Sequence, residues 1–400
     1  MSVAMPFLSL IAVGSQYPTP GRCLVPNSLD DSVNNVLWSA QSRRTEADVI
    51  IDVHAHVIPG EGPADHGQHC APAHPHIESV DEDGARALVV DKVRFPVERV
   101  WYSAERRLEA MDAVGLDAEV VSPMPLLLNP RVDPLAEREV CRWVNEFIVG
   151  LCEADPRRMM GLGSVPLQDP DLAAAMLGEV RAMGLRGVEV ASHVGGRSIG
   201  DERFWGFFEE AERLGVPVLV HALAPTVGDR IPGPAMATFG VGVEGALGVA
   251  SVVTGGLAEA CPDLHLAFTH GGGGAAMMLT RAQWFWGRTW NEEPPAGSGD
   301  SAPEGPSPLE LARRFWYDAL VFDRRALRYL IDLLGPSRLM VGSDFAAMPR
   351  EDPAARTLLS MDLAPGVAED ITWNNCWHFL GVAPPVAEEV AAASREPGTR

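Results

Sequence analysis

Basic residues are scarce in this sequence. It contains 32 Lys and Arg against 54 Asp and Glu, which gives a formal net charge of −22 at pH 7. Nucleic acids and anionic membranes attract basic surfaces, so this charge argues against both classes of partner. It does not exclude an anionic small molecule as substrate, because one local cation or Arg can reverse the field inside a pocket.

Long apolar runs and paired cysteines are also missing. No stretch is long enough to span a bilayer, and the nearest candidate, residues 3–14, is short and has no Lys or Arg ahead of it, unlike a signal peptide. The six cysteines are scattered without a CxxC pair, which is typical of a reduced protein and argues against a disulfide framework. We therefore expect a cytoplasmic protein.

From residue 48 onward, short apolar runs alternate with amphipathic segments. The hydrophobic fraction of 46% and the charged fraction of 22% are those of a globular protein. The apolar runs predict eight strands, at 48–53, 118–122, 160–165, 186–191, 216–221, 264–269, 314–319 and 338–342. Helices are predicted between them at 104–114, 134–154, 171–183, 202–214, 245–261, 274–290 and 323–334. This alternation predicts an α/β fold, a (β/α)8 TIM-type barrel, with an open doubly wound sheet as the alternative.

The two ends of the chain depart from this pattern. Residues 1–47 mix Pro, Gly, Asn and Ser without a sustained period, and we expect a loosely ordered N-terminal extension. The barrel is expected to occupy residues 48–382, with a low-complexity segment at 291–308. Residues 383–400 predict a flexible C-terminal tail, in which 388–394 favour a helix.

Two histidines, His54 and His56, stand two residues apart beside the first apolar run. Because strand side chains alternate, both imidazoles should project from one face near the strand end. The pair alone fits a hydrogen-bond network as well as it fits half of a metal site. Three further predicted strands also lead to metal-competent side chains, His221, His270 and Asp344. In a parallel barrel these strand ends share one face, which predicts a common site at its mouth.

A second group of histidines lies between residues 60 and 84. It contains His66, His69, His74 and His76 beside Cys70. These side chains are candidates for a second metal site. Their irregular spacing among Pro, Gly and acidic residues favours instead a solvated insertion between the first strand and the first helix, over the active face.

Taken together, the motifs resemble the amidohydrolase superfamily. More specifically, they look like the branch of aminocarboxymuconate-semialdehyde decarboxylase and the related metal-dependent, non-oxidative decarboxylases of hydroxybenzoates. The resemblance extends from about residue 49 to residue 382. It is carried by segments 51–56, 161–168, 219–221, 268–273 and 342–344.

This resemblance implies a site with assigned roles. His54, His56, His221 and Asp344 would bind one divalent metal ion, most commonly Zn²⁺, although the donor types alone also suit Mn²⁺ or Co²⁺. His270 would be the catalytic acid/base, with Asp344 also counted among the catalytic residues. The resemblance further implies homodimers or larger assemblies, in which Arg281 reaches into the site of the neighbouring subunit.

Two aspartates are expected to support this site from behind. Asp52 lies between the first apolar run and the histidine pair, and Asp318 lies at the end of the seventh predicted strand. Both are interpreted as partners that orient the ligands rather than as ligands themselves.

The predicted activity is the decarboxylation of an aromatic or unsaturated, muconate-like carboxylic acid, which makes the protein a carbon–carbon lyase. Loss of CO₂ leaves a carbanion, so the site must supply a sink for its charge and a proton, which His270 can provide near neutral pH. The predicted strands contain no Lys that could bridge two metal ions.

The chain departs from the family pattern at several positions. Residues 222–224 read Ala-Leu-Ala where the decarboxylase has Pro-Trp-Asp, and Phe345-Ala346 stands where Tyr-Pro is frequent. The family's carboxylate-binding arginine aligns with Phe95, next to Arg94. These changes predict a reshaped, more apolar pocket. They also keep open a metal-dependent hydrolase of a C–C, amide or lactone bond that uses metal-bound hydroxide. A binding protein with an inactive site is disfavoured, because all five polar site residues are present.

Overall fold

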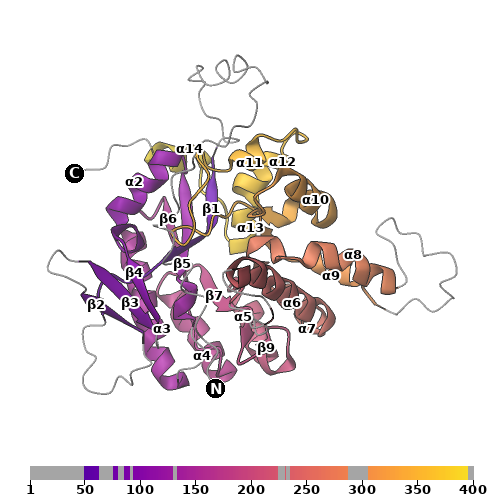
Figure 1. Ribbon diagram of the computed structural model, residues 1–400, viewed down its shortest axis with the longest axis horizontal. Helices are drawn as coiled ribbons and strands as arrows, with labels where there is room; N and C mark the ends of the chain where they lie inside the picture. Colours follow the sequence, from indigo (N-terminus) through magenta and orange to yellow (C-terminus); the bar gives the residue numbers. More distant parts are fainter. Residues whose placement is uncertain are drawn as a thin grey trace, which may run out of the picture.

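Eight parallel strands form the centre of the computed structural model (Figure 1). The structure describes residues 49–62, 75–79, 85–90, 93–128, 133–223, 230, 235–286 and 305–394. In spatial order the strands are β1 (Ile51–Val57), β5 (Ala118–Pro123), β6 (Met159–Gly163), β7 (Gly187–Ala191), β10 (Val218–His221), β11 (Leu266–Phe268), β12 (Trp316–Asp318) and β13 (Leu339–Met340).

Contacts between the first and last strands close the sheet into a barrel. The backbone N–H of Val53 donates to the carbonyl of Val341 at 2.8 Å, and Ala55 forms a parallel bridge with Phe345. The predicted (β/α)8 barrel is therefore confirmed, and the open doubly wound sheet is excluded, because such a sheet has no contact between its edge strands.

Helices cover the outside of this barrel. The longer ones are α2 (Ala104–Val114), α3 (Pro134–Glu153), α4 (Pro170–Ala182), α5 (Trp205–Leu214), α6 (Val241–Thr254), α8 (Ala275–Phe285) and α10 (Arg324–Leu334). Shorter ones are α7 (Leu257–Ala260), α9 (Pro308–Ala312), α11 (Arg356–Leu359), α12 (Val367–Glu369), α13 (Asn375–Leu380) and α14 (Ala387–Ala393). Single helical turns are η3 (Arg99–Trp101), η4 (Pro125–Leu127), η5 (Glu202–Phe204), η7 (Met236–Gly240), η8 (His270–Gly272), η9 (Pro336–Arg338) and η10 (Asp370–Asn374).

Side-chain caps explain where several helices begin. The carboxylates of Asp133, Asp169 and Asp323 each accept a hydrogen bond from a backbone N–H in the first turn of α3, α4 and α10. At the other end, α5 stops at Gly215, whose left-handed φ of 61° costs a glycine little.

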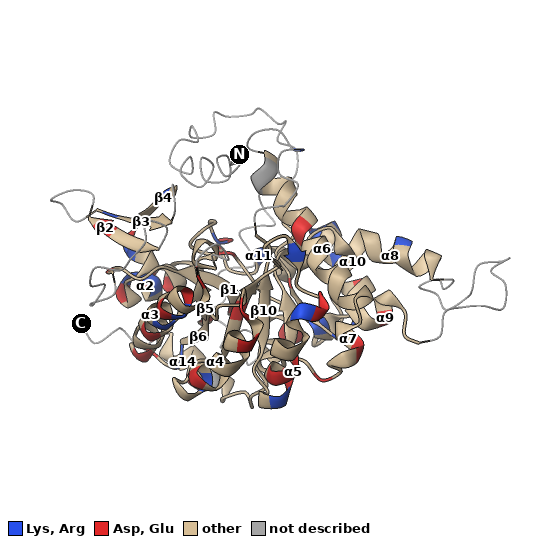
Figure 2. Cartoon of the chain, turned by 90° about the horizontal axis from the view of Figure 1, so that it is seen from below, with Lys and Arg blue, Asp and Glu red and all other residues tan. Residues whose placement is uncertain are grey.

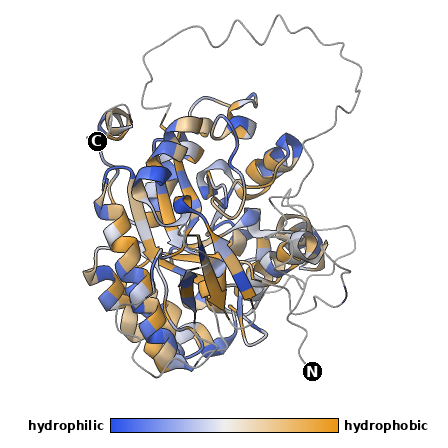
Figure 3. Cartoon of the chain, turned by 60° about the vertical axis from the view of Figure 1, so that its left-hand side comes forward, coloured by the Kyte–Doolittle hydropathy of each residue, from blue (hydrophilic) through white to orange (hydrophobic). Residues whose placement is uncertain are grey.

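Two apolar clusters fill the molecule, and Figure 3 shows hydrophobic residues concentrated on the strands and on the helix faces that meet them. The smaller cluster takes residues from seven barrel strands, including Val53, Val120 and Leu219, and none from the surrounding longer helices, so it is the barrel interior. The larger cluster lies between the strands and those helices. Burial of this apolar area is the main favourable contribution to folding.

The C-terminal segment corrects one predicted boundary. The tail 383–400 was expected to be flexible, with a helix favoured at 388–394; residues 387–393 form α14, and its Val390 is buried in the interior cluster. The hydroxyl of Ser394 also donates to Asp117 Oδ1, just before β5, at 3.0 Å. The helix therefore covers the amino-terminal end of the barrel, where its small apolar face packs against the apolar side chains of the barrel interior.

Several element boundaries also differ from the prediction. β1 continues to Val57, so His54 and His56 lie within the strand rather than beyond it. It extends because Ala55 and His56 pair both with β5 and with the segment after β13. The helix predicted over 245–261 is divided into α6 and α7 by Gly255 and Gly256, the latter with a φ of 93°.

A small antiparallel sheet follows β1, where the sequence predicted an irregular insertion. It consists of β2 (His76–Ser79), β3 (Arg86–Val90) and β4 (Val93–Val97), and Figure 2 shows it standing apart from the barrel strands. His66, His69, His74 and Cys70, the candidates for a second metal site, lie outside the described residues. The extension 1–47 lies outside them as well. Among the described helices, none is long and apolar enough to cross a membrane.

One buried carboxyl group stands out in this fold. Glu137, in the first turn of α3, is 2% exposed, and its Oε2 has no hydrogen-bond partner among the described residues. Burial raises the pKa of Glu137 to about 8. The folded protein therefore holds a proton there at neutral pH that the unfolded chain, with an ordinary glutamate pKa, releases.

We predict that Glu137 makes stability fall as the pH rises from about 5 to about 8, because the folded state binds the extra proton in this window. Glu137→Gln cannot ionise, so it lacks this loss of stability. The free energy of unfolding of the variant minus that of the unaltered protein should therefore increase by about 1.4 kcal/mol per pH unit across the window. Urea denaturation at pH 5, 6, 7 and 8 measures this. The exposed Glu139→Gln on the same helix is the control, and parallel pH profiles for both variants would contradict the prediction.

Candidate metal centre and active site

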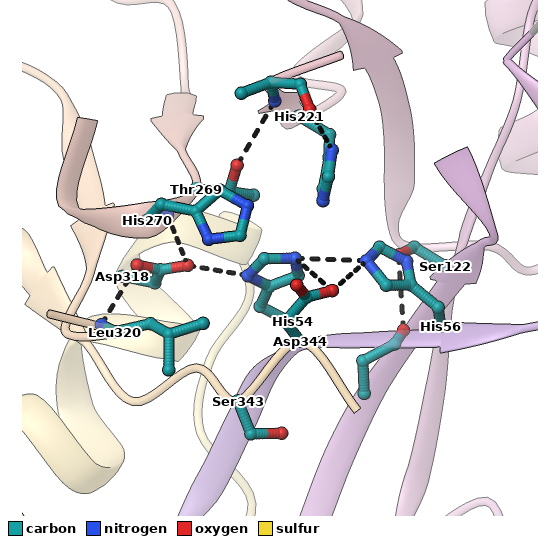
Figure 4. Close-up of polar contacts among 12 residues, drawn as sticks. His54, His56, Ser122, His221, Thr269, His270, Asp318, Leu320, Ser343 and Asp344 are labelled. Atoms are coloured by element: carbon teal, nitrogen blue, oxygen red, sulfur yellow. Dashed lines mark hydrogen bonds and ion pairs between the residues drawn. The ribbon is translucent and has the colours of Figure 1, made fainter. Parts of the chain in front are cut away.

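Four metal-competent side chains from three strands converge at the mouth of the barrel (Figure 4). His54 and His56 project from β1, His221 is the last residue of β10, and Asp344 follows β13. One ligand atom from each lies within 4.8 Å of all the others, and all four residues are buried. The structure thus brings together residues that the sequence places far apart.

The donor atoms point at a common volume. His54 Nε2 lies 3.1 Å from His56 Nε2, and Asp344 Oδ1 lies 3.0 Å from His56 Nε2 and 3.6 Å from His54 Nε2. His221 Nε2 is buried and has no hydrogen-bond partner in the described part of the chain. Three imidazole nitrogens and one carboxylate oxygen left facing one another fit a divalent cation, and four protein ligands leave a position open on an ion that takes five or six.

The opposite ring nitrogens are held from behind. His54 Nδ1 contacts Asp318 Oδ2 at 2.7 Å, and His56 Nδ1 contacts the carbonyl oxygen of Pro123 at 3.1 Å. His221 Nδ1 contacts the carbonyl oxygen of Ala222 at 2.9 Å. Because each acceptor favours a proton on Nδ1, each Nε2 keeps its lone pair for a metal ion.

Burial and charge set the protonation of this cluster. Burial lowers the pKa of His56 to about 4 and also lowers that of His221, so both imidazoles are neutral at pH 7. Burial also acts against a charged His54, but the carboxylates of Asp318 and Asp344 outweigh it and raise the pKa of His54 to about 9. The pKa of Asp344 lies well below its usual range, because the surrounding histidines outweigh the effect of burial. A metal ion therefore needs to displace one proton, from His54.

Asp318 organises the adjacent segments. Besides His54, its carboxylate accepts hydrogen bonds from the backbone N–H groups of His270 and Gly271, both at 2.8 Å, and of Leu320 at 3.1 Å. Although burial opposes ionisation, the hydrogen bond and charge of His54, together with His270, hold the pKa of Asp318 below its usual value. Asp318 thus joins a candidate metal ligand to the backbone of the candidate acid/base, which agrees with the supporting role predicted for it.

His270 lies beside the four ligands. Its ring centroid is 5.1 Å from that of His54 and 5.2 Å from that of His221, and its Nε2 is buried without a partner among the described atoms. His270 itself has a φ of 55°, a conformation that costs a non-glycine residue about 1 kcal/mol or more and that clusters at functional sites.

The glycines after His270 serve the turn itself. Gly271 to Gly273 all have positive φ, and a Cβ on Gly273 would lie 2.2 Å from the carbonyl oxygen of Gly242 in α6. These glycines therefore let the turn pack closely against its protein neighbours.

The structure does not bring Arg281 to this centre. Arg281 is exposed on α8, where its guanidinium lies 5.0 Å from the ring of Phe285. Neither Arg94 nor Phe95 replaces the missing carboxylate-binding arginine. Arg94 pairs with Glu78 at 3.3 Å in the small sheet, and Phe95 is buried with its ring centroid 5.3 Å from that of Trp101.

Several buried charges near the site were missed by the sequence analysis. Glu189 on β7 is fully buried, with Oε1 3.9 Å from His56 Nδ1, and burial raises its pKa to about 8. Glu119 on β5 and Arg107 on α2 form a buried ion pair beside β1. The available signal was a charged residue within an apolar run, as in Gly187–Ala191 and Ala118–Pro123.

The fold and these residues define a metal-dependent barrel enzyme. The chain belongs to the amidohydrolase family, whose sequence pattern matches residues 51–382.

The chain is similar to several decarboxylases in sequence and in fold. The chain is 25% identical over 338 residues to the 2-amino-3-carboxymuconate-6-semialdehyde decarboxylase of Dictyostelium discoideum, covering 84% of this chain and 92% of the relative. Its fold is similar to that of 5-carboxyvanillate decarboxylase LigW from Sphingomonas paucimobilis, with a TM-score of 0.61, 26% identity and coverage of 70% and 83%. A dihydroxybenzoic acid decarboxylase from Polaromonas, solved with bound manganese, shares the fold with a TM-score of 0.62 at 20% identity, with coverage of 83% and 97%.

Removal of one ligand tests the convergence directly. Asp344→Ala should weaken binding of Zn²⁺ or Mn²⁺ by more than about 100-fold, because loss of a ligand costs more than loss of a supporting residue. Isothermal titration of the metal-free protein measures the affinity. Asp323→Ala, which removes an exposed helix cap, is the control and should bind as the unaltered protein does. Equal affinities for the two variants would remove Asp344 from the ligand set.

Proposed function

We propose that this protein is a metal-dependent, non-oxidative decarboxylase of an aromatic or unsaturated carboxylic acid. The observation that carries the proposal is the buried convergence of three imidazoles and one carboxylate beside His270, whose Nε2 has no partner among the described residues. The similar decarboxylases support this substrate class, because their names give a carboxymuconate semialdehyde and a carboxyvanillate as substrates.

One divalent ion is proposed at His54, His56, His221 and Asp344. Nitrogen-rich sites suit Zn²⁺, which is our first choice, and the manganese bound in the Polaromonas enzyme supports Mn²⁺ as the alternative, with Co²⁺ also compatible with these donors. When bound, such an ion would supply positive charge that attracts the oxygens of the acid and draws electron density from the reacting carbon.

His270 is proposed to hold and deliver the proton. The bond between the reacting carbon and the carboxylate breaks, CO₂ leaves, and the electron pair stays on the carbon, which takes the proton from His270 Nε2. Burial lowers the pKa of His270, so the free ring is neutral and first takes up a proton, which it then gives up readily to the carbon. The hydrogen bonds from the backbone of His270 and Gly271 to Asp318 fix the segment that aims the ring.

His270→Ala should retain metal affinity and lose nearly all CO₂ release, by about 100- to 10,000-fold in kcat, which is the usual contribution of general acid–base catalysis. A panel of hydroxybenzoates and muconate-like acids, with CO₂ and ultraviolet absorbance recorded together, provides the measurement. Loss of metal by this variant would make His270 a ligand. Hydrolysis products without CO₂ from the unaltered protein would replace the decarboxylase with a hydrolase.

The protein is further proposed to act as a homodimer. Exposed apolar side chains gather on two adjacent helices and the turn before them: Phe239, Val243 and Leu247 on η7 and α6, and Met277, Met278, Trp284 and Phe285 on α8. Figure 2 shows both helices with few charged residues. Such apolar patches mark interaction sites on proteins, and a second copy of the chain is the partner we propose. Arg281 lies within this surface, which supports its predicted approach to a neighbouring site.

Complementation tests the shared site. Arg281→Ala and His270→Ala should each be inactive as homodimers. After subunit exchange their mixture should recover about a quarter of the original activity, because half of the dimers then contain one intact site. The control adds Phe285→Glu, which puts a charge on the apolar surface, to both variants, and their mixture should stay inactive. The shared site would be contradicted if the mixture of Arg281→Ala and His270→Ala also stayed inactive, or if Arg281→Ala alone were fully active.

We also assign the protein to the cytoplasm. The four described cysteines, Cys141, Cys152, Cys261 and Cys376, are free thiols, and three of them are buried. Free thiols support a reducing compartment, where disulfides are rare.

A further inference from the structure

The metal ligand Asp344 lies in a segment without regular structure. β13 ends at Met340, and the next helix, α11, begins at Arg356. Asp344 also has a φ of 57°, a left-handed conformation that the surrounding structure needs to enforce. Its backbone N–H donates to the carbonyl oxygen of His54 at 2.8 Å, and its own carbonyl oxygen accepts from Met348 N at 2.8 Å. The neighbouring Phe345 accepts a hydrogen bond from His56 N through its carbonyl oxygen.

A buried cluster of four charged side chains packs against this segment. Asp52 on β1 and Glu119 on β5 are opposite each other in the strand register, so their carboxylates face the same side. Arg107 on α2 and Arg350, which follows the Asp344 segment, lie between them. The side chains of all four are no more than 4% exposed.

Hydrogen bonds join this cluster to both ligand-bearing segments. Arg350 donates to Glu119 and, at 3.4 Å, to Asp52, which in turn accepts from the backbone N–H and the hydroxyl of Ser343. Arg107 donates to Glu119 and, at 2.9 Å, to the carbonyl oxygen of His56.

The ring of Phe345 links the cluster to the ligand next to it. The guanidinium carbon of Arg350 lies 3.8 Å from the ring centroid, and that of Arg107 lies 5.4 Å from it. Both guanidinia therefore stack on the residue that follows Asp344. Burial would raise the pKa of Glu119, but the charges of Arg107 and Arg350 outweigh it and keep this carboxylate ionised.

Such a cluster is not explained by stability alone. Desolvating four charges costs about as much as their attraction returns, and packed apolar side chains in their place are often equally stable. A fixed geometry is the benefit that buried ion networks bring in some proteins, because each hydrogen bond permits only a narrow range of orientations. Here the groups they orient are the backbone of His56 and the residues on either side of Asp344.

We propose that Arg350 is a positioning residue of the metal centre, which holds Asp344 in place by fixing Ser343 through Asp52 and by clamping Phe345. Arg107 does the same for His56 through its carbonyl oxygen. This inference rests on the proposed metal centre but not on the reaction that occurs there, so metal binding tests it without any assay of decarboxylation.

The experiment compares two equally buried arginines. Arg350→Met removes the clamp. Arg158→Met is the matched control, because Arg158 is also 4% exposed in its side chain but donates to the carbonyl oxygens of Leu116 and Asp117, before β5 at the opposite end of the barrel. Each metal-free variant is titrated with Zn²⁺ and Mn²⁺, the visible spectrum of its Co²⁺ form is recorded, and its melting temperature is measured in EDTA.

Arg350→Met should bind metal about 10- to 100-fold more weakly than the unaltered protein and show an altered Co²⁺ spectrum, which reports the coordination geometry. Arg158→Met should lose melting temperature but keep the original affinity and spectrum. Unchanged affinity and spectrum in Arg350→Met, or equal losses in both variants, would overturn the proposal.

A second substitution covers the case in which Arg350→Met does not fold. Phe345→Leu keeps an apolar side chain and removes the aromatic face, and it should weaken metal binding several-fold and alter the Co²⁺ spectrum. Original affinity and spectrum in Phe345→Leu would count against the clamp. Absence of metal binding by the unaltered protein is a distinct result, which would overturn the metal centre and this inference together.

Discussion

Closure of the barrel between β1 and β13 is the constraint on which the site depends. The hydrogen bond from Val53 to Val341 and the bridge between Ala55 and Phe345 bring the two ends of the sheet together. Without this closure, His54 and His56 would not meet Asp344, because this residue reaches them only as the chain leaves the last strand. The same contacts bury the cluster, so the three imidazoles are kept out of water with their Nε2 atoms facing inward.

A second set of contacts fixes the orientation of the converging side chains. Asp318 binds the rear of His54 and the backbone of the turn that carries His270, so one carboxylate sets the relation between a metal ligand and the proton donor. On the opposite side of β1, Arg107, Glu119, Arg350 and Asp52 connect the strand to the Asp344 segment. The two networks flank the histidine pair, and together they restrict the positions that the donor atoms can adopt.

The sequence predicted the barrel and the four converging residues because both follow from local patterns. Apolar runs that end on His221 or lead to His270 and Asp344 reveal strands and their carboxyl ends together, and a parallel barrel places all such ends on one face. The supporting contacts were harder to predict. Arg350 meets Glu119 only after the barrel has closed, and no spacing in the sequence encodes that contact. The helix near 388–394 was expected within a flexible tail, and its packing was not predicted, because its short run of Ala and Val gains its stability from the barrel end it covers.

The most direct test is a crystal structure of the protein grown with Mn²⁺ or Zn²⁺, with the ion located by its anomalous scattering. The account predicts one strong peak per chain within about 2.0–2.2 Å of the Nε2 atoms of His54, His56 and His221 and a carboxylate oxygen of Asp344. A protein without such a peak at this position, or with its ion bound by a different set of residues, would contradict it.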